Sequence, residues 1–333
     1  MVNVAICGVG VWGKNFVRNF CEVKDANLLM CCDNEEKALG WVKENFPQVK
    51  LTSNYDEVLR NSKVDAVVIA TPAHTHFEIA RKALEAGKHI LVEKPLTLKS
   101  SQAEVLLNLA QRKKKKLMVG HLLRYHPAAI EMKKILEKKL LGQVFYIDSR
   151  RVGLGRIREV ENVMWCLGIH DVYLAIYLLG MYPERVAAFG GSFLQRKKEI
   201  EEVVFLHLFF RDGIFSHIHA SWLNAEKQRT TCIVCEKGVV LFDEVLSSLK
   251  ICEGGILKKE NLQDALFEIK KGTYKTVKVE KKEPLKEECV HFIRCIKEDK
   301  NPLTDGKEGL GVVRVLEIAQ RSLKRGKIFN VRI

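Results

Sequence analysis

The chain has 333 residues, of which 47% are hydrophobic and 29% charged, and its formal net charge is +14. This length allows two domains with a core each, and no stretch reaches the ~18 uninterrupted apolar residues of a membrane span. We expect no membrane partner. The basic run Arg112–Lys116 lacks the interleaved aromatic residues of a nucleic-acid site, so we expect a solvated helix end and no nucleic-acid partner. The excess of lysine fits either attraction of anionic ligands or adaptation to high temperature.

The ten cysteines are spread along the chain, and the one Cys-x-x-Cys pair, Cys232 and Cys235, lies in a β-branched run. Residues three apart on a strand face opposite sides, so these thiols should diverge rather than form a disulfide or bind zinc. The start, MVNVAICG, enters an apolar run without a basic segment or cleavage site. We therefore expect a cytoplasmic protein with free thiols.

The first 120 residues alternate short apolar runs with amphipathic segments. This alternation predicts a parallel sheet covered by helices on both faces, in an N-terminal domain over 1–120. The expected strands are 2–7, 26–32, 64–70, 89–93 and 117–119, and the expected helices are 12–22, 35–46, 54–61, 75–87 and 100–113.

A glycine cluster follows the first strand directly. Gly8 permits a tight turn, Gly10 lets a pyrophosphate approach the backbone, and Gly13 lets the next helix pack closely. The free N–H groups at the start of that helix favour phosphate. Asp33 ends the second strand, where its carboxylate can accept hydrogen bonds from the adenosine ribose and repel a 2′-phosphate. The pattern predicts a Rossmann domain that binds NAD.

After Gly120 the pattern changes, which predicts a second, α+β domain over 121–333. Its expected helices are 127–139, 169–179, 283–297 and 307–324, and its expected strands are 143–152, 185–194, 200–210, 214–224, 228–236 and 239–243. Hairpin-like links at 211–213 and 236–238 favour a mostly antiparallel sheet. The run Val203–Phe210 is apolar on both faces, and an apolar sheet face of this size would not stay exposed. We therefore expect a homodimer or homotetramer formed through an open sheet face.

The segment Glu93-Lys94-Pro95 ends the fourth predicted strand of the first domain. Ligands of parallel α/β sheets bind beyond the carboxyl ends of the strands, so a lysine at this point is a candidate acid or base. A surface lysine is the structural alternative.

Together, Gly8-x-Gly10-x-x-Gly13, Thr71-Pro72-x-x-x-His76 and Glu93-Lys94-Pro95 resemble the glucose–fructose oxidoreductase, inositol dehydrogenase and MocA family over essentially the whole chain. The resemblance implies that Lys94 is catalytic, that Pro95 orients it, and that further residues line the cofactor site. The expected cofactor-binding residues are Gly8, Gly10, Val11, Trp12, Gly13, Asp33, Thr71, Pro72, His76, Glu93, Lys94, His121 and Trp165.

The family also carries an aspartate, three residues and a histidine on a helix of the second domain. His170 matches this histidine, but Cys166 occupies the aspartate position, which weakens any proton relay that needs a carboxylate there. We expect Lys94 and His170 to transfer the proton between themselves. Asp171 could orient His170 or cap its helix, and we favour capping.

Several arginines lie between 124 and 158, and guanidinium groups suit phosphate and carboxylate oxygens. This segment is similar to a branch of the family that acts on UDP-N-acetylglucosamine, or its uronic acid, at the sugar 3-hydroxyl; a solvated basic loop is the alternative. The expected substrate-binding residues are Lys94, Arg124, Arg151, Arg156, Arg158, Asn162 and His170.

Three interpretations follow from the sequence. The first is an NAD-dependent dehydrogenase of a UDP-sugar; the second keeps the chemistry with an inositol, free sugar or polyol; the third is an NAD-sensing regulator without catalysis. Retention of Lys94 and His170 argues against the third. His207, His217 and His219 could converge on a metal, but no carboxylate pattern accompanies them, so we expect none.

Overall fold

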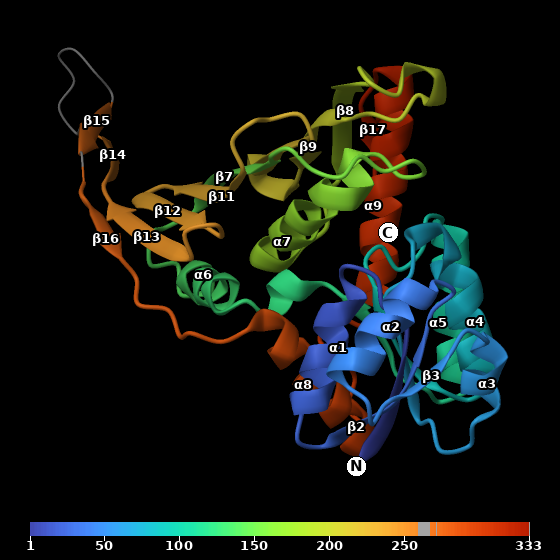
Figure 1. Cartoon of the computed structure of the whole chain (residues 1–333). Coiled ribbons are helices and arrows are strands. Elements are labelled where there is room, and N and C mark those ends of the chain that lie inside the picture. The colour runs from blue at the N-terminus through green and yellow to red at the C-terminus, as the bar shows by residue number, and fades with distance from the viewer. Residues whose placement is uncertain (259–266, 271, 333) are drawn as a thin grey trace. The chain divides into compact units, whose positions relative to one another are not determined.

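The computed structural model describes residues 1–258, 267–270 and 272–332. The chain forms two compact units, and each contains a C-terminal segment (Figure 1). Unit 1 comprises 1–125 and 282–314, and unit 2 comprises 126–281 and 315–333. Among the described residues, no helix is both long and apolar enough to cross a membrane.

Unit 1 contains a six-stranded sheet in the order β3-β2-β1-β4-β5-β6, in which every described pairing is parallel. The doubly wound Rossmann prediction is confirmed. The strands are β1 (Val2–Cys7), β2 (Ala26–Cys32), β3 (Lys50–Thr52), β4 (Ala66–Ile69), β5 (His89–Glu93) and β6 (Leu117–Gly120). Sequence reasoning missed β3 because three residues are too few to show a pattern.

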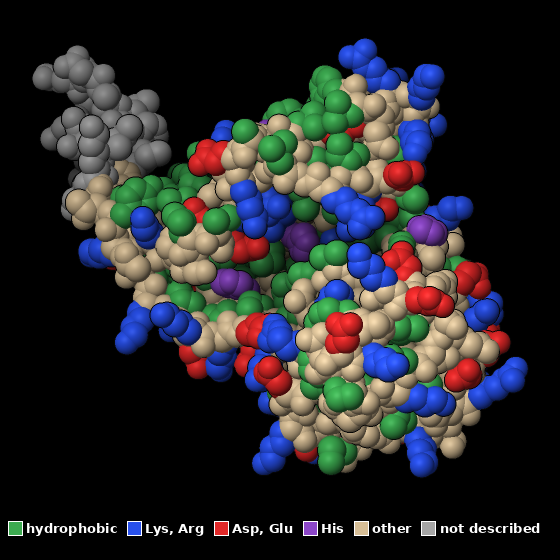
Figure 2. Space-filling model, in the orientation of Figure 1, with side chains coloured by type: hydrophobic (Ala, Val, Ile, Leu, Met, Phe, Trp, Pro, Cys, Tyr) green, Lys and Arg blue, Asp and Glu red, His purple; other side chains and the backbone are tan. Residues whose placement is uncertain are grey.

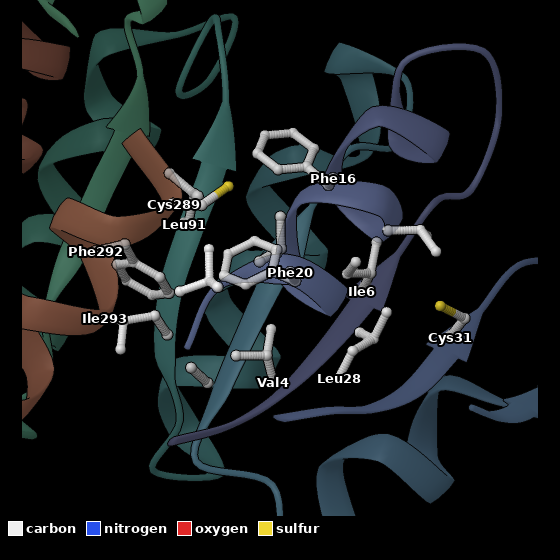
Figure 3. Close-up of a cluster of buried hydrophobic side chains, with 14 of the residues drawn as sticks. Val4, Ile6, Phe16, Phe20, Leu28, Cys31, Leu91, Cys289, Phe292 and Ile293 are labelled. Atoms are coloured by element: carbon white, nitrogen blue, oxygen red, sulfur yellow. The ribbon is translucent and has the colours of Figure 1, made fainter. Parts of the chain in front are cut away.

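Helices cover both faces of this sheet. They are α1 (Gly13–Glu22), α2 (Glu36–Asn45), α3 (Tyr55–Arg60), α4 (His76–Glu85), α5 (Ser100–Arg112) and α8 (Pro284–Lys297), with 3₁₀ turns η1 (Ala73–Thr75) and η2 (Leu122–Tyr125). Figure 3 shows the core on one face, where Phe16 and Phe20 of α1 meet Ile6 of β1 and Phe292 of α8. These four side chains are fully buried, so α8 completes the core of a domain that precedes it by more than 150 residues.

Unit 2 contains a nine-stranded sheet in the order β16-β13-β12-β11-β7-β10-β9-β8-β17. Its strands are β7 (Val144–Val152), β8 (Arg185–Gly191), β9 (Val203–Phe209), β10 (Phe215–Ser221), β11 (Gln228–Cys235), β12 (Gly238–Asp243), β13 (Ser248–Glu253), β16 (Tyr274–Thr276) and β17 (Phe329–Asn330). The predicted hairpins β9–β10 and β11–β12 are antiparallel, whereas β7 lies between β10 and β11 and pairs with β10 in parallel. The mostly antiparallel prediction is confirmed. A separate ribbon pairs β14 (Gly255–Lys258) with β15 (Phe267–Lys270).

Unit 2 also contains α6 (Pro127–Glu137), the π-helical turn η3 (Met164–Gly168), α7 (Ile169–Leu179), and the 3₁₀ turns η4 (Arg196–Lys198) and η5 (Arg211–Gly213). Helix α9 (Gly306–Arg325) contributes residues to both units.

The two faces of the nine-stranded sheet differ. Val204, Leu206 and Leu208 alternate along β9 on the buried face, and α7 packs against β7 and β10. The opposite face leaves aromatic side chains accessible: Phe189 is 51%, Phe205 39% and Phe215 37% exposed. Among the described residues, this face, which the sequence predicts to be open, therefore carries partly exposed aromatic side chains.

Candidate active site

The glycine cluster forms the turn between β1 and α1. Gly8 has φ +88°, and a Cβ there would lie 2.7 Å from the backbone of Ala70 and Thr71. A Cβ on Gly13 would lie 2.0 Å from the Gly8 carbonyl oxygen, whereas Gly10 has open space around it. Two glycines are thus required by the turn itself, and the third leaves the backbone open to a ligand.

Asp33 is fixed beside this turn. Its Oδ2 accepts a hydrogen bond from the Val9 N–H at 2.7 Å, and its Oδ1 accepts one from the Glu35 N–H at 2.9 Å. These bonds join the end of β2 to the glycine turn and to the start of α2. A carboxylate can accept further bonds, so Asp33 retains capacity for ribose hydroxyls.

Glu93 connects the glycine turn to the Glu-Lys-Pro segment. Its carboxylate accepts a hydrogen bond from the Trp12 indole N–H, and its Oε2 accepts one from the Lys94 N–H at 3.1 Å. A Cβ on Gly120 would lie 3.1 Å from Glu93 Oε1, so the neighbouring strand needs a small residue here. Burial raises the pKa of Glu93, and Lys94 and Trp12 oppose that rise.

His76 joins the ends of β4 and β5. Its Nδ1 lies 2.7 Å from the Pro95 carbonyl oxygen and its Nε2 lies 2.9 Å from that of Thr71. Burial lowers the pKa of His76, and the two carbonyls oppose this effect. The imidazole is buried between the segment that contains Thr71 and Pro72 and the segment that contains Lys94, so it positions both.

His121 follows β6 and is buried. Burial, with a smaller contribution from the positive charge of Lys94, lowers the pKa of His121 to about 3. The imidazole of His121 is therefore neutral and is close enough to Lys94 for the lysine charge to affect its pKa. Arg124, in η2, is half-buried. Thus the predicted residues Trp12, Glu93 and Lys94 come together in unit 1, along with the groups that fix them.

Unit 2 holds the other candidate catalytic side chain. His170 lies in the first turn of α7, directly after the π-helical turn that contains Cys166. π-helical turns inside helices are frequent at functional sites. Both side chains are half-buried. Because Lys94 belongs to unit 1 and His170 to unit 2, their convergence stays a prediction.

Asp171 does not cap α7, contrary to the expectation from sequence. Its Oδ2 and Oδ1 accept hydrogen bonds from Arg151 Nε at 2.7 Å and Nη2 at 3.2 Å, and Nη2 also donates to Glu244 Oε2 at 3.0 Å. The ion pair is buried, with side chains 6% and 1% exposed. The two carboxylates raise the pKa of Arg151 against the effect of burial. The guanidinium that sequence reasoning assigned to substrate therefore binds carboxylates beside His170.

Asn162 and Trp165 are buried in a polar network that sequence reasoning missed. Gln320 Oε1 accepts hydrogen bonds from Asn162 Nδ2 at 2.9 Å and from Trp165 Nε1 at 3.1 Å. Glu201 Oε2 accepts a second bond from Asn162 at 2.7 Å. The only signal in the sequence was a glutamine on the otherwise apolar stripe of α9.

Arg156 and Arg158 are exposed, and Arg158 lies 3.8 Å from Glu161 in an i,i+3 ion pair. A neighbouring segment holds the loop that contains them. Gln195 Nε2 donates a hydrogen bond to the Arg158 carbonyl oxygen at 2.7 Å, and the buried Glu202 accepts one from the Gln195 N–H at 2.9 Å. These two guanidinium groups are accessible to a ligand, unlike that of Arg151.

The histidines on β9 and β10 contact one another and the neighbouring aromatic ring of Phe205. The rings of His207 and His217 lie 4.6 Å apart, and Phe205 stacks on His219 at 4.4 Å. Within the described part of the chain, no group of three or more His, Cys, Asp or Glu residues is placed to hold a metal ion. In Figure 2, lysine and arginine side chains are spread over the visible face and interspersed with acidic ones.

Comparisons with known proteins identify the family of this chain. The model of the oxidoreductase family with an NAD-binding Rossmann fold matches residues 2–121, and that of the GFO/IDH/MocA C-terminal domain matches 130–241. UDP-N-acetylglucosamine 3-dehydrogenase from Acidithiobacillus ferrooxidans is 28% identical over 76% of this chain and 78% of its own. A solved structure of the A. ferrooxidans enzyme has a TM-score of 0.82 at 24% identity and covers 97% of this chain and 98% of that one.

A second solved structure, scyllo-inositol dehydrogenase from Lactobacillus casei with bound NAD(H) and scyllo-inositol, has a TM-score of 0.81 at 17% identity and covers 99% of both chains. The fold and the glycine turn define a dinucleotide-binding oxidoreductase. The chain belongs to the Gfo/Idh/MocA family, and its N-terminal unit is an NAD-binding Rossmann domain.

Proposed function

We propose that this chain is an NAD-dependent dehydrogenase that oxidises the 3-hydroxyl of a UDP-N-acetylamino sugar. The observation that carries the proposal is the hydrogen-bonded link between the glycine turn, here called the cofactor turn, and Lys94. The Glu93 carboxylate accepts hydrogen bonds from the Trp12 indole N–H and from the Lys94 N–H. The similarity to a UDP-N-acetylglucosamine 3-dehydrogenase over most of the chain supports the substrate class.

The residues present fit NAD. Gly10 leaves room for a pyrophosphate, and Asp33 is held where its remaining lone pairs can accept ribose hydroxyls. When bound, NAD supplies a hydride acceptor. The negative charge of Asp33 disfavours a 2′-phosphate, so we propose NAD rather than NADP as the working cofactor. Val11, Thr71, Pro72, His121 and Trp165 complete the proposed cofactor set.

Lys94 is the proposed base. Its amine accepts the proton of the sugar hydroxyl while the carbon–hydrogen bond of the same carbon breaks, so the alcohol becomes a ketone and the proton stays on the protein. His76 and Glu93 hold the backbone around Lys94 in place. His170 is proposed to share the proton with Lys94, and Asp171 fixes the helix of His170 through Arg151.

The diphosphate of the substrate requires cations. Arg156 and Arg158 are exposed and are proposed to bind it. Arg124, which follows the proposed cofactor-binding residue His121 in the sequence, is proposed to bind substrate as well. Arg151 and Asn162 form hydrogen bonds with Asp171 and Gln320, so we propose that they hold neighbouring segments in place and do not bind the substrate directly. Replacing Arg156 and Arg158 by glutamine should raise KM for a UDP-sugar, whereas Arg196→Gln, an exposed arginine in η4, should leave KM unchanged.

A substrate panel tests the proposal. UDP-N-acetylglucosamine, its uronic acid, inositol and glucose are each mixed with NAD or NADP, reduced nicotinamide is followed by absorbance, and the product is weighed by mass spectrometry. We expect NAD reduction with a UDP-sugar and a product lighter by two hydrogens. Turnover of inositol or glucose alone would favour the polyol alternative. NAD binding without any turnover would favour a sensor.

We also propose that the open sheet face joins copies of this chain into a dimer or tetramer. Aromatic residues Phe189, Phe205 and Phe215 are exposed on that face, and burying them between two copies removes apolar surface from water. Phe205→Glu should lower the mass measured by sedimentation equilibrium, whereas Leu246→Glu, in an exposed turn, should not. A monomeric wild type would refute this. The ten free cysteines support a reducing, cytoplasmic location.

A further inference from the structure

Two cysteines end the neighbouring strands that carry the cofactor turn. Cys7 and Cys32 are the last residues of β1 and β2 and are paired in the parallel register. As directly paired residues they have their side chains on the same face of the sheet, and both residues are almost inaccessible, at 3% and 6% exposure. Since successive residues of a strand face opposite sides, Cys31 faces the core drawn in Figure 3, and the Cys7–Cys32 pair lies on the other face of the sheet.

Both sides of the cofactor turn begin at this pair. Gly8 follows Cys7, and its N–H donates to the Cys32 carbonyl oxygen at 2.9 Å. Asp33 follows Cys32, and its carboxylate accepts the Val9 N–H at 2.7 Å. A change in the separation of the two cysteines therefore acts directly on the groups that receive pyrophosphate and ribose.

We propose that Cys7 and Cys32 form a reversible oxidation site that controls NAD binding. A hydroperoxide is the oxidant. The sulfur of Cys32 attacks the terminal peroxide oxygen and becomes a sulfenic acid as an alcohol or water leaves. The sulfur of Cys7 then displaces hydroxide, so a disulfide and water are formed. Two electrons and two thiol protons pass to the peroxide in total, and a dithiol reductant reverses the reaction.

The proposed reaction requires Cys32 to be the more reactive of the two thiols. Burial raises the pKa of Cys7 well above its usual range, whereas the neighbouring Cys7 thiol lowers the pKa of Cys32. Cys32 is thus the better nucleophile, because the thiolate is the form that reacts. Tyr55 of α3 donates a hydrogen bond to the Ile79 carbonyl oxygen at 2.8 Å. Burial raises the pKa of Tyr55, and Cys7 and Cys32 add to that rise. Asp33 and Glu57 oppose the lowering of the Cys32 pKa.

A disulfide would disturb the turn because the surrounding backbone has little freedom. The Cβ atoms of a disulfide lie ~3.8 Å apart, whereas neighbouring strands such as β1 and β2 are ~4.8 Å apart, so oxidation must draw the ends of β1 and β2 together. Gly8 has little room to absorb the shift, since even a Cβ there would lie 2.7 Å from the backbone of Ala70 and Thr71. By linkage, bound NAD must oppose the oxidation as strongly as oxidation weakens NAD binding.

The inference rests on NAD binding alone and is independent of the proposed substrate. The full-length protein is treated with hydrogen peroxide, alkylated under denaturing conditions and digested, and peptides linked through Cys7 and Cys32 are measured by mass spectrometry. NAD affinity is measured by calorimetry on reduced, oxidised and re-reduced samples. We expect the linked peptide to accumulate, NAD affinity to fall roughly tenfold and recover on reduction, and saturating NAD to slow the linkage.

Cys32→Ala should keep its NAD affinity in peroxide, whereas Cys21→Ala, which removes an exposed thiol, should respond like the wild type. If no peptide links Cys7 to Cys32, the site does not exist. If the linkage forms and NAD affinity is unchanged, it does not control the cofactor. Neither result depends on turnover, so failure of the proposed dehydrogenase activity would be recognised separately.

Discussion

The indole N–H of Trp12 donates a hydrogen bond to the carboxylate of Glu93, 81 residues further along the chain. This bond joins the glycine turn, where phosphate is expected, to the strand end that carries Lys94. The two motifs that sequence reasoning identified separately are therefore parts of one constellation within unit 1.

Trp12→Phe removes this donor and keeps an aromatic ring. A hydrogen bond to a charged group contributes ~1.5–3 kcal/mol, and the partial exposure of Trp12 reduces that value. We expect NAD affinity to fall about threefold to tenfold, as measured by calorimetry. Trp41→Phe, on α2, is the control and should leave affinity unchanged. Equal affinities for wild type and Trp12→Phe would show that the bond does not organise the cofactor site.

His76→Ala removes the imidazole that lies between the carbonyl oxygens of Thr71 and Pro95. A displacement of about 1 Å at a reacting group can cost ~100-fold in rate. We expect kcat for NAD reduction to fall about tenfold to 100-fold and the pH–rate profile to shift, with a smaller change in NAD affinity. His74→Ala, two residues away and exposed, is the matched control. An unaltered kcat and pH profile would remove His76 from the positioning of Lys94.

Asp171→Asn leaves the buried Arg151 guanidinium with one carboxylate, Glu244. Breaking one partner of a buried ion pair costs ~3–5 kcal/mol, and Glu244 reduces this to an expected loss of about 2–4 kcal/mol in the free energy of unfolding, measured with denaturant. Glu78→Gln, which breaks an exposed pair with Arg81, should change stability by less than ~1 kcal/mol. Equal effects of the two substitutions would mean that burial does not strengthen the Arg151 pair.

Glu288, on α8, is buried, and no described residue forms a hydrogen bond with its carboxyl oxygens. Burial, and then the negative charge of Glu93, raises its pKa well above the usual range. Because the folded chain holds this proton more tightly than the unfolded chain, the carboxyl weakens stability progressively as pH rises above ~4.5 toward the folded pKa, by ~1.4 kcal/mol per pH unit.

Glu288→Gln removes that titration. We expect the variant to gain stability over the wild type as pH rises from about 4.5 to 8, and to differ little at pH 4.5, when denaturant unfolding is measured across this range. Glu287→Gln, the adjacent half-buried residue, should show a nearly constant difference. A pH-independent effect of Glu288→Gln would mean that this carboxyl is not neutral in the folded protein.

Local patterns were sufficient for most of unit 1. The alternation of apolar runs and helices predicted five of its strands to within two residues, and Gly8 has the positive φ that its turn requires. Three-residue strands such as β3 and the placement of α8 on the N-terminal core could not be predicted, because they depend on packing between segments distant in sequence. Within the second sheet, chain order does not reveal that β7 separates β10 from β11.

Local motifs were sufficient to single out candidate site residues, whereas contacts between distant segments could not be predicted. Lys94 and Asp33 were proposed from their places at strand ends, and Glu93 from the resemblance to the family. Arg151 was assigned to substrate because a free guanidinium was assumed, but the pairing with Asp171 exists only in the folded chain. Gln320 left a weak signal, a polar residue within the apolar stripe of α9, and Glu288 left the same signal on α8.

The most direct test of the account mixes the protein with NAD and UDP-N-acetylglucosamine and follows the absorbance of reduced nicotinamide, for the wild type and for Lys94→Met, with NAD affinity measured on both. We predict reduction by the wild type, loss of at least ~1000-fold in rate for Lys94→Met, in keeping with removal of a general base that also positions the substrate, and similar NAD affinity for the two. Full activity of Lys94→Met would show that Lys94 does not take the hydroxyl proton.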